Sequence, residues 1–569
     1  MCRSIFPDII LRGIFTIIFS FSIQSIQAQV TQNWVARYNG PVNTNDEAYS
    51  VAVDDTGNVY VTGGSSGNTS SCMTTIKYNP SGVQQWVARY YGIAIGPNEA
   101  RCIKLDRFGN VYVTGSACVS SPAHTDLVVI KYNSAGTQQW LVSYHPVTDE
   151  GSEGMALAFD IYGYIYAAGS TNMTPDSADF VTIKYIPSGA QQWVRIYDGP
   201  TKYIDIAYRI AADYSGNIIT EGISWINQFY YEYAIVKYSG SGVEQWVVRQ
   251  FGSDDLSRWG NGIAVDHANN IYLTGTSGYG GIQDMMTVKF DQSGYQKWIA
   301  MYSLPVEPTR CEGSAVFVDT GQNVYVTGFS DVTSPIYNTG CVTVKYNSSG
   351  VQQWAAVYNG PTYSAFGRRI CLDADKNVYV GGYSADGPQL GYDYLTLKYD
   401  SNGIQKWAEV YDNAGSDFDF EWDMTIDKDK NVYVTGQSGG VNTGDDFATI
   451  KYSQPIGIHS ISSSLPKEYK LYQNYPNPFN PSTKIRFELR PPLNPLSRER
   501  DVPLSKEGTL VSLIIYDILG REVATLVDEQ LKPGSYEVEW DASAYPSGVY
   551  FYRLQTESFS ETKKLILSK

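Results

Sequence analysis

Histidine is scarce in this chain, and its few copies do not form a pattern that binds a metal. The 569 residues contain four histidines, His124, His145, His267 and His459, without any paired spacing. Transition-metal sites in proteins need several such ligands at short, regular intervals. The sequence therefore predicts no metal centre of that kind, and no cofactor is expected.

The chain also lacks an apolar run long enough to cross a membrane as a helix. The best candidate, Gly13 to Ile23, is only about eleven residues long, whereas a spanning helix needs roughly twenty. Arg3 and Arg12 flank this run, and small residues follow it at 25–28. The arrangement is typical of a secretory signal peptide, which we expect at residues 1–28, with a membrane anchor as the less favoured alternative.

Basic residues are too few to form a positively charged surface. The chain has 42 Lys and Arg against 58 Asp and Glu, which gives a formal net charge of −16. Proteins that bind nucleic acids or anionic membrane surfaces present clusters of positive charge. Neither is expected as a partner of this protein.

Helical periodicity is missing from most of the chain, and a repeat of about fifty-three residues takes its place. One tryptophan marks each of eight copies, at Trp34, Trp86, Trp140, Trp193, Trp246, Trp298, Trp354 and Trp407. A lysine followed by an aromatic residue recurs in step, from Lys77-Tyr78 to Lys451-Tyr452. Because insertions are confined to loops, each copy is one supersecondary unit packed on its neighbours.

Each repeat has the pattern of four short β-strands. Alternating runs rich in Val, Ile, Tyr and Trp are separated by Gly, Asn, Ser and Pro. An aspartate begins the same hairpin turn in every copy, at Asp54, Asp106, Asp160, Asp213, Asp266, Asp319, Asp373 and Asp427. Aspartate accepts backbone amides in such turns, and glycine supplies positive φ. Four strands per unit indicate propeller blades, with a solenoid as the alternative.

The two ends of the repeat array favour the propeller and predict how the ring closes. If the first blade begins at about Ala48, the eighth blade lacks its fourth strand. The leftover phrase around Trp34 can supply that strand, so that the two ends of the array pair in one blade. We therefore expect an all-β fold, an eight-bladed β-propeller with four-stranded blades, over residues 29–453.

The repeats resemble a known family. The phrase Gly57-Asn-Val-Tyr-Val-Thr-Gly63 and the run from Ile76 to Trp86 are similar to the bacterial β-propeller repeats called SBBP repeats. The resemblance covers roughly residues 31 to 453. It implies the propeller fold and no particular reaction.

A segment of different composition follows a linker expected at 454–466. Its motifs lie at 472–481, 514–521, 534–541, 547–554 and 563–569. They closely resemble the type A C-terminal sorting domain of the type IX secretion system, which we assign to 467–569, with a Pro-rich and charged insertion at 491–508. The resemblance implies a small immunoglobulin-like β-sandwich, a bacterium of the Bacteroidota or a near relation, and an extracellular or outer-membrane surface location. The partners that it implies are the type IX translocon and a sortase-like protease.

Two motifs imitate chemical sites without their usual context. Ser65 lies in a G-x-S-x-G sequence, but the motif follows a propeller strand rather than a strand-to-helix turn. Asp373 and Asp427 begin runs similar to a calcium loop, but valine replaces the tight glycine and serine replaces the bidentate glutamate. No catalytic residue is assigned, and structural calcium at these turns is the less favoured interpretation.

Departures from the repeat are better candidates for ligand binding than the repeated residues, which packing explains. In a propeller of this strand order, the loops entering the first strand and those joining the second to the third lie on one face. The aromatic candidates on these loops are Trp225, Phe229, Tyr230, Tyr231, Trp259 and Trp422. Aromatic planes near carboxylates suit stacking on sugar rings. Packing onto neighbouring blades is the alternative for each of them.

Two functions stay open at this point. We favour a secreted or cell-surface propeller that is a non-enzymatic binding or scaffold module for a glycan or a protein. The alternative is an extracellular polysaccharide lyase or glycoside hydrolase that uses carboxylates on the loop face, with Asp254 and Asp417 as nominal candidates. Whether the protein is an enzyme is left open, with the non-enzymatic function favoured.

Six cysteines remain once Cys2 has left with the signal peptide. Export through the periplasm permits disulfides. Cys311 precedes the first strand of one blade and Cys341 begins the third strand of that blade, so we expect them to form a disulfide. Cys102 and Cys371 fall inside inner strands, where a buried thiol is expected.

Overall fold

The structure is a computed structural model, and it describes part of the chain as two compact units of β-strands. The described residues are 30–569 except 121–123, 147–149, 175–176, 228–229, 251–256, 280–281, 305–308, 333–337, 361–363, 386–390, 414–417, 441–442, 455–458, 463–465, 492–508, 532 and 543–544. One unit ends at Gln454, and the other begins at Pro455. Forty strands and no helix occur in the described residues, so none of these residues forms a helix that could cross a membrane. The predicted signal peptide lies outside the described residues.

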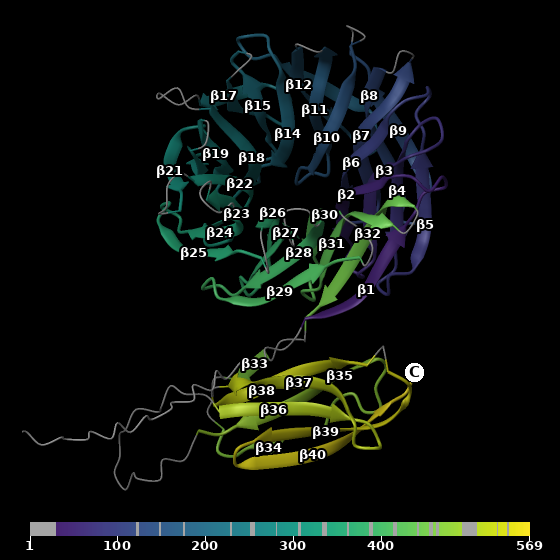
Figure 1. Ribbon diagram of the computed structural model, residues 1–569, viewed down its shortest axis with the longest axis vertical. Coiled ribbons are helices and arrows are strands. Elements are labelled where there is room, and N and C mark those ends of the chain that lie inside the picture. The colour runs from purple at the N-terminus through teal and green to yellow at the C-terminus, as the bar shows by residue number, and fades with distance from the viewer. Residues whose placement is uncertain are drawn as a thin grey trace, which may run out of the picture. The chain divides into compact units, whose positions relative to one another are not determined.

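The first unit is a ring of antiparallel four-stranded groups (Figure 1). Four groups are separate sheets in chain order: β2 (Asp46–Val53), β3 (Val59–Ser65), β4 (Cys72–Tyr78) and β5 (Gln84–Tyr90); β6 (Asn98–Leu105), β7 (Val111–Ser120), β8 (His124–Tyr132) and β9 (Gln138–Tyr144); β10 (Ser152–Phe159), β11 (Ile165–Thr174), β12 (Ser177–Tyr185) and β13 (Gln191–Tyr197); β14 (Asp205–Ala212), β15 (Ile218–Trp225), β16 (Tyr231–Tyr238) and β17 (Glu244–Gln250).

The next twelve strands belong to one sheet, because single parallel bridges join adjacent groups at Gln283–Arg310 and Thr339–Ser364. Its three groups are β18 (Ser257–Val265), β19 (Ile271–Tyr279), β20 (Ile282–Phe290) and β21 (Gln296–Tyr302); β22 (Thr309–Val318), β23 (Val324–Val332), β24 (Asn338–Tyr346) and β25 (Gln352–Tyr358); β26 (Ser364–Leu372), β27 (Val378–Ala385), β28 (Tyr392–Tyr399) and β29 (Gln405–Tyr411).

The last group of the ring is completed by the N-terminal strand. It contains β30 (Asp419–Ile426), β31 (Val432–Gly440), β32 (Gly444–Ser453) and β1 (Thr31–Tyr38). β1 pairs with β32 in antiparallel register, with Val35 opposite Ile450. The predicted all-β propeller and its closing strand are confirmed, and the grouping agrees with the eight four-stranded blades expected from the repeat.

The repeat pattern follows from where each strand lies in its group. The second strand is covered on both faces by neighbouring groups, so Val59, Tyr60 and Val61 are all fully buried. The outer strand carries the tryptophan, which packs on the next group. Trp34, for example, donates its indole NH to the Pro80 carbonyl oxygen (3.0 Å). Its ring covers Gly82, which has a φ of 80° and leaves no room for a side chain.

The recurring aspartate organises the turn between the first and second strands. Asp54 Oδ1 accepts the backbone amides of Thr56 (3.0 Å) and Asn58 (2.9 Å), and Oδ2 accepts the Tyr60 hydroxyl (3.1 Å). Asp373 and Asp427 accept the equivalent amides. Their carboxylates therefore serve the hairpin turn, which is the interpretation favoured from the sequence.

The second unit consists of two four-stranded sheets around one apolar core. The sheets are β33 (His459–Ser462), β38 (Gly534–Asp541), β35 (Ser482–Leu489) and β34 (Lys470–Leu471), and β37 (Glu522–Leu531), β36 (Thr509–Tyr516), β39 (Gly548–Thr556) and β40 (Phe559–Leu567). Phe487, Leu513 and Tyr552 are fully buried between them. β33 falls inside the range expected as a linker, so part of that range belongs to this unit.

Candidate ligand-binding site on the inner strands

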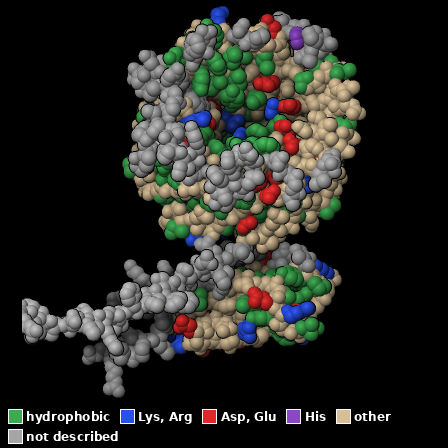
Figure 2. All heavy atoms as spheres, viewed as in Figure 1, with side chains coloured by type: hydrophobic (Ala, Val, Ile, Leu, Met, Phe, Trp, Pro, Cys, Tyr) green, Lys and Arg blue, Asp and Glu red, His purple; other side chains and the backbone are tan. Residues whose placement is uncertain are grey.

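The innermost strand of each group borders the middle of the ring, where Figure 2 shows a hollow with charged side chains around it. Each of these strands has a β-bulge at the same place, such as Ala48 to Ser50 in β2 and Ala207 to Arg209 in β14. Several groups carry a small residue just after the bulge, including Ser50 and Ala156. Arg209, like Arg369 and Asp423 in two other groups, places a charged side chain at this position, which borders the ring's interior.

A cavity of about 390 Å³ lies beside Arg209. Its lining residues are Tyr208, Arg209, Ile223, Trp225, Tyr231 and Asn261, from β14, β15, β16 and β18. Trp225 and Tyr231 stand opposite each other in the β15–β16 ladder, with ring centroids 5.7 Å apart and planes tilted by 37°. The Trp225 indole NH is buried and donates to no described acceptor. The cavity thus combines two aromatic planes with an available donor.

Arg209 adds a positive charge that its surroundings only partly balance. Its guanidinium donates to the Tyr208 carbonyl oxygen (3.1 Å) and forms no ion pair with a described carboxylate. Burial, together with the nearby charge of Arg369, lowers the pKa of Arg209 to about 10. The group still carries its charge at neutral pH, so it is suited to meeting an anionic ligand group.

Two glutamates near the cavity have weakened acidity. Burial raises the pKa of Glu221 to about 7, and the charge of Arg209 opposes that shift. Asn261, which lines the cavity, donates to Glu312 Oε1 (3.2 Å), and burial also raises the pKa of that carboxyl group. Arg310 and Asn261 act in the opposite direction on Glu312. Both carboxyl groups are therefore easier to protonate than ordinary surface glutamates.

The aromatic residues and aspartates that the sequence suggested as binding or catalytic candidates do not all lie at this cavity. Trp225 and Tyr231 line the cavity together. Tyr230 is half-buried in the turn between them, where its carbonyl oxygen accepts the Ile226 amide (2.8 Å). Trp259 belongs to β18, but its side chain is not described, and Phe229 lies outside the described residues. Asp254 and Asp417 also lie outside them.

Trp422 is engaged in packing and does not line this cavity. Its indole NH donates to Gln437 Oε1 (3.3 Å), and the Arg368 guanidinium lies 4.4 Å from its ring centroid. Tyr49 meets the ring edge-on at 5.7 Å, and Phe420 stacks at 6.1 Å. The packing alternative therefore accounts for Trp422.

Tyr208, Arg209 and Asn261 were missed because the sequence search concentrated on loops. All three lie on inner strands, at the bulges of β14 and β18. The available signal was the variation at this repeat position, where Arg209, Arg369 and Asp423 are charged and the other five copies have small residues. That signal identifies the position but does not show which blades meet around it.

The expected disulfide between Cys311 and Cys341 is wrong: both side chains are buried thiols. Cys311 belongs to β22 and Cys341 to β24, and β23 lies between them. Strands two apart are separated by roughly 10 Å, which exceeds the reach of a disulfide. The two thiols also pack in different cores, Cys311 with Tyr272 and Cys341 with Ala365. Cys102 and Cys371 are thiols as expected.

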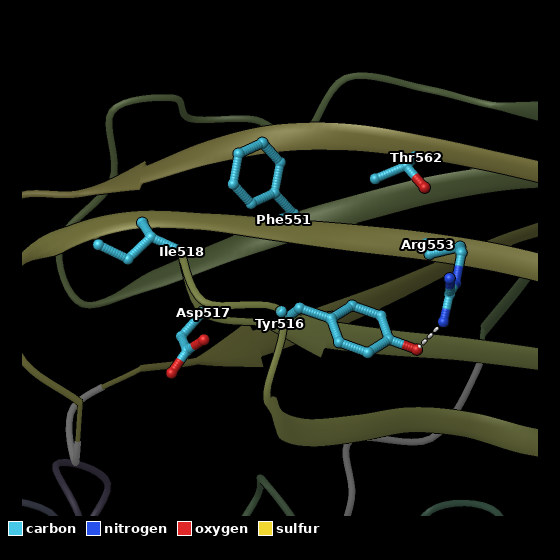
Figure 3. A pocket seen from close by; sticks show the side chains of 7 residues that line it. Tyr516, Asp517, Ile518, Phe551, Arg553 and Thr562 are labelled. Carbon is cyan, nitrogen blue, oxygen red and sulfur yellow. Dashed lines mark hydrogen bonds between the residues drawn. The ribbon is translucent and has the colours of Figure 1, made fainter.

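The second unit has a cavity of its own, of about 330 Å³ (Figure 3). It is lined by Tyr516, Asp517, Ile518, Gly520, Phe551, Arg553 and Thr562. Figure 3 shows the Arg553 guanidinium directed at the Tyr516 hydroxyl, which accepts its hydrogen bond. Asp517 is likewise occupied, because its Oδ2 accepts from Arg521 (2.7 Å). Tyr516, Arg553 and Asp517 in this cavity thus already have partners within the chain.

The ring of repeated four-stranded sheets defines a β-propeller, and the two-sheet unit after it is a separate module. Residues 34–68 and 245–278 match the family described as Beta-propeller repeat (SBBP), and residues 473–568 match the Secretion system C-terminal sorting domain. The ring thus contains SBBP-type β-propeller repeats, and the second unit contains a secretion system C-terminal sorting domain. No curated protein sequence matches this chain.

Solved structures resemble the chain only distantly. Polysaccharide lyase Uly1 is 12% identical, with 66% of this chain and 93% of that chain covered and a TM-score of 0.42. The β-propeller domain of the Trilobed protease from Pyrococcus furiosus is 6% identical, with 62% and 95% covered and a TM-score of 0.36. A Dyadobacter fermentans protein of unknown function is 11% identical, with 54% and 96% covered and a TM-score of 0.33. Such likeness carries no conclusion about activity.

Proposed function

We propose that this exported propeller is a glycan-binding module and that the cavity around Trp225 and Tyr231 is its binding site. The paired rings supply the flat apolar surface on which a sugar ring stacks, and they lose little side-chain entropy on binding. The buried Trp225 NH and the Asn261 amide supply directed polar groups beside that surface. The combination of two aromatic planes with these groups in one cavity is the observation that supports the proposal.

Arg209 points to the class of glycan. Its charge lies in the cavity lining without a carboxylate partner among the described residues, and a guanidinium binds carboxylate or sulfate through two parallel hydrogen bonds. A neutral sugar would leave that charge buried and poorly compensated. The ligand is therefore a glycan that carries an acidic group, such as a uronic acid or a sulfated sugar.

A glycan array probed with the purified full chain tests this function. Acidic glycans should bind, and the double variant Trp225→Ala/Tyr231→Ala should lose that binding while keeping the parent's circular dichroism spectrum. Tyr295→Ala is the matched control, because Tyr295 is an exposed aromatic residue (74%) outside the cavity. If the double variant still binds acidic glycans, the Trp225 and Tyr231 rings serve only packing, and this binding site is contradicted.

The enzymatic alternative has one observation in its favour. Glu312 contacts the cavity residue Asn261, and burial holds its pKa above the ordinary value, as a general acid or base requires. A lyase would create a new carbon–carbon double bond in a uronate polymer, and a hydrolase would release reducing ends. Both products can be measured with the full chain and with Glu312→Gln. If the full chain forms either product and Glu312→Gln abolishes its formation, the protein is an enzyme. If neither product forms, the non-enzymatic binding function is supported.

The C-terminal sorting domain directs the chain to export through the type IX system. We propose that residues 1–28 are a signal peptide that first directs the chain to the periplasm. We propose that a sortase-like protease removes the C-terminal domain in the last step of export. The mature protein then acts at the cell surface or in the medium, where it meets extracellular glycans.

A further inference from the structure

Four neighbouring groups of the ring carry large apolar side chains at the tip of their first turn. In every group the recurring aspartate begins the turn between the first and second strands, and the two residues after it form the tip. In the groups that begin with β6, β10, β14 and β18, the tips are Arg107-Phe108, Ile161-Tyr162, Tyr214-Ser215 and His267-Ala268. The tips of the other four groups, at 55–56, 320–321, 374–375 and 428–429, hold four charged residues and no aromatic one. We call the first four tips the aromatic arc.

The apolar side chains of the aromatic arc are largely exposed. Phe108 is 73% exposed, Tyr162 69%, Ile161 60% and Tyr214 46%. A single apolar side chain on a surface needs no explanation, whereas a contiguous set is typical of an interaction site. The arc is such a set, because its tips belong to consecutive groups of the ring.

The tips of the arc are held in place and contact one another. The Tyr162 amide donates to Asp160 Oδ1 (2.9 Å), and the Tyr162 ring lies so close to the turn of the next group that a Cβ on Gly216 would be 2.8 Å from it. The Tyr214 ring stacks in turn on the His267 imidazole, with ring centroids 4.3 Å apart and planes tilted by 20°. From Tyr162 to His267 the arc is therefore a continuous and ordered surface.

The aromatic arc lies on the other face of the ring from the cavity. Tyr214 lies in the turn before β15, and Trp225 is the last residue of that strand. A strand of this length spans about 25 Å. A molecule bound at the arc would therefore leave the cavity around Trp225 and Tyr231 free.

We propose that two copies of the chain associate through the aromatic arc as a two-fold dimer. Arg107 is the one charged residue among the eight tip residues of the arc, whereas the whole chain carries a formal net charge of −16. Two acidic molecules repel each other over most of their surface, and the repulsion is smallest where the local charge is low. The distribution of charge thus favours self-association at this face.

A two-fold axis between the second and third tips of the arc also gives matching contacts. The same surface serves both copies in such a dimer, so the first tip of one copy lies opposite the fourth tip of the other. The Arg107 guanidinium of one copy then meets the stacked rings of Tyr214 and His267 in the other. A guanidinium on an aromatic face is a favourable contact.

The area of the arc agrees with a weak, specific dimer. An aromatic side chain has a surface of roughly 200 Å², so the exposed fractions correspond to on the order of 500 Å² of apolar surface per copy. Two arcs would bury on the order of 1,000 Å², which is the lower end of the range for specific interfaces. Because the tips are already ordered, little conformational entropy is lost on association.

The dimer would make the proposed glycan binding bivalent, and this one consequence rests on the proposed function. The two cavities would lie on the outer faces of the dimer and point away from each other. One dimer could then link two glycan chains without any further contact to either sugar.

Sedimentation equilibrium of the purified full chain, without glycan, tests the dimer. Between about 1 and 100 μM, where an interface of this size dissociates, the average mass should rise from one chain toward two. The double variant Phe108→Ser/Tyr162→Ser should weaken dimerisation at least about tenfold. It should keep the parent's melting temperature, because both side chains are exposed. Ile404→Ser is the matched control, because Ile404 is an apolar residue exposed by 58% in another group, and this variant should dimerise as the parent does.

The proposal is overturned if the parent stays monomeric at about 100 μM, or if the double variant dimerises as strongly as the parent. A monomeric parent whose binding to a glycan array is lost in Phe108→Ser/Tyr162→Ser would assign the arc to a sugar and would equally reject the dimer. Because the mass is measured without glycan, a monomer that binds acidic glycans contradicts the dimer alone. A dimer that binds no acidic glycan contradicts only the proposed function.

Discussion

Glu421 of β30 fills the space beside Gly381 of β27, where a side chain on the glycine would collide with the glutamate carboxyl group. The equivalent pair, where β23 of one group lies beside β26 of the next, is Thr327 facing Gly367. In the Thr327–Gly367 pair the larger side chain lies on the second strand of its group and the glycine on the first strand of the next. In the Glu421–Gly381 pair the two are exchanged. Burial raises the pKa of Glu421 well above its ordinary value, so the exchange places a weakly acidic carboxyl group inside the ring.

This exchange predicts strong coupling between the two positions. Gly381→Thr alone should destabilise the ring by about 1–3 kcal/mol, because the new side chain overlaps Glu421. Glu421→Gly alone should leave a cavity and also destabilise. The double variant recreates the Thr327–Gly367 pairing, so it should recover most of the loss. Urea unfolding of the four proteins measures the coupling, and strictly additive losses would refute the exchange.

Glu221 should make the ring less stable as the pH rises. Its pKa is about 7 in the folded chain, against an ordinary 4.5, so the folded state binds the proton more tightly than the unfolded state. Its contribution to stability is full below pH 4.5 and is lost as the pH rises through about 7, a total on the order of 3 kcal/mol. Unfolding free energies measured between about pH 5 and pH 8 should fall less steeply for Glu221→Gln. Glu244→Gln, at an exposed glutamate in β17, should keep the parent's slope.

Deleting β1 should open the ring. Arg37 of this strand donates to Ser438 Oγ (2.6 Å) and pairs with Asp446, and the Trp34 ring lies 6.3 Å from Tyr78 and 6.2 Å from Tyr433. Without residues 30–38, the edge of β32 and the surface of the neighbouring group that Trp34 covers are exposed. The loss should exceed the ~1–3 kcal/mol of an ordinary point change. Thermal melts measure it, with Gln32→Ala on the exposed end of β1 as the control. An unchanged melting temperature would contradict closure by β1.

Truncation after Gln454 should separate folding from export. The ring is a compact unit that ends at that residue, so it should fold without the rest of the chain. Because the sorting domain is removed, the truncated protein should accumulate in the periplasm. Fractionation and immunoblotting measure the distribution, with the full chain as the control. Normal amounts of truncated protein outside the cell would show that export does not depend on this domain.

Features carried by local patterns could be predicted from the sequence. The Asp54 turn and the Trp34 contact recur in register because each depends on residues of one repeat or of its immediate neighbour. The closing role of β1 followed from counting strands in the array. The pairing of Trp225 with Tyr231 could be anticipated because both flank one short turn.

Features that depend on how separate repeats meet could not be predicted in the same way. Arg209 and Asn261 come from different blades, and only the closed ring brings them to one cavity. The disulfide expectation failed because it considered the height of Cys311 and Cys341 but not the strand between them or the opposite faces they occupy.

The most direct test of the binding account compares one acidic glycan with its carboxyl-reduced, neutral counterpart by calorimetric titration. Parent protein should prefer the acidic form by about tenfold or more, equivalent to ~1.4 kcal/mol, because Arg209 pairs with the carboxylate. Arg209→Gln should remove that preference, Arg209→Lys should keep part of it, and Trp225→Ala should weaken both glycans alike. Equal affinity of the parent for the two glycans, or an unchanged preference in Arg209→Gln, would contradict the account.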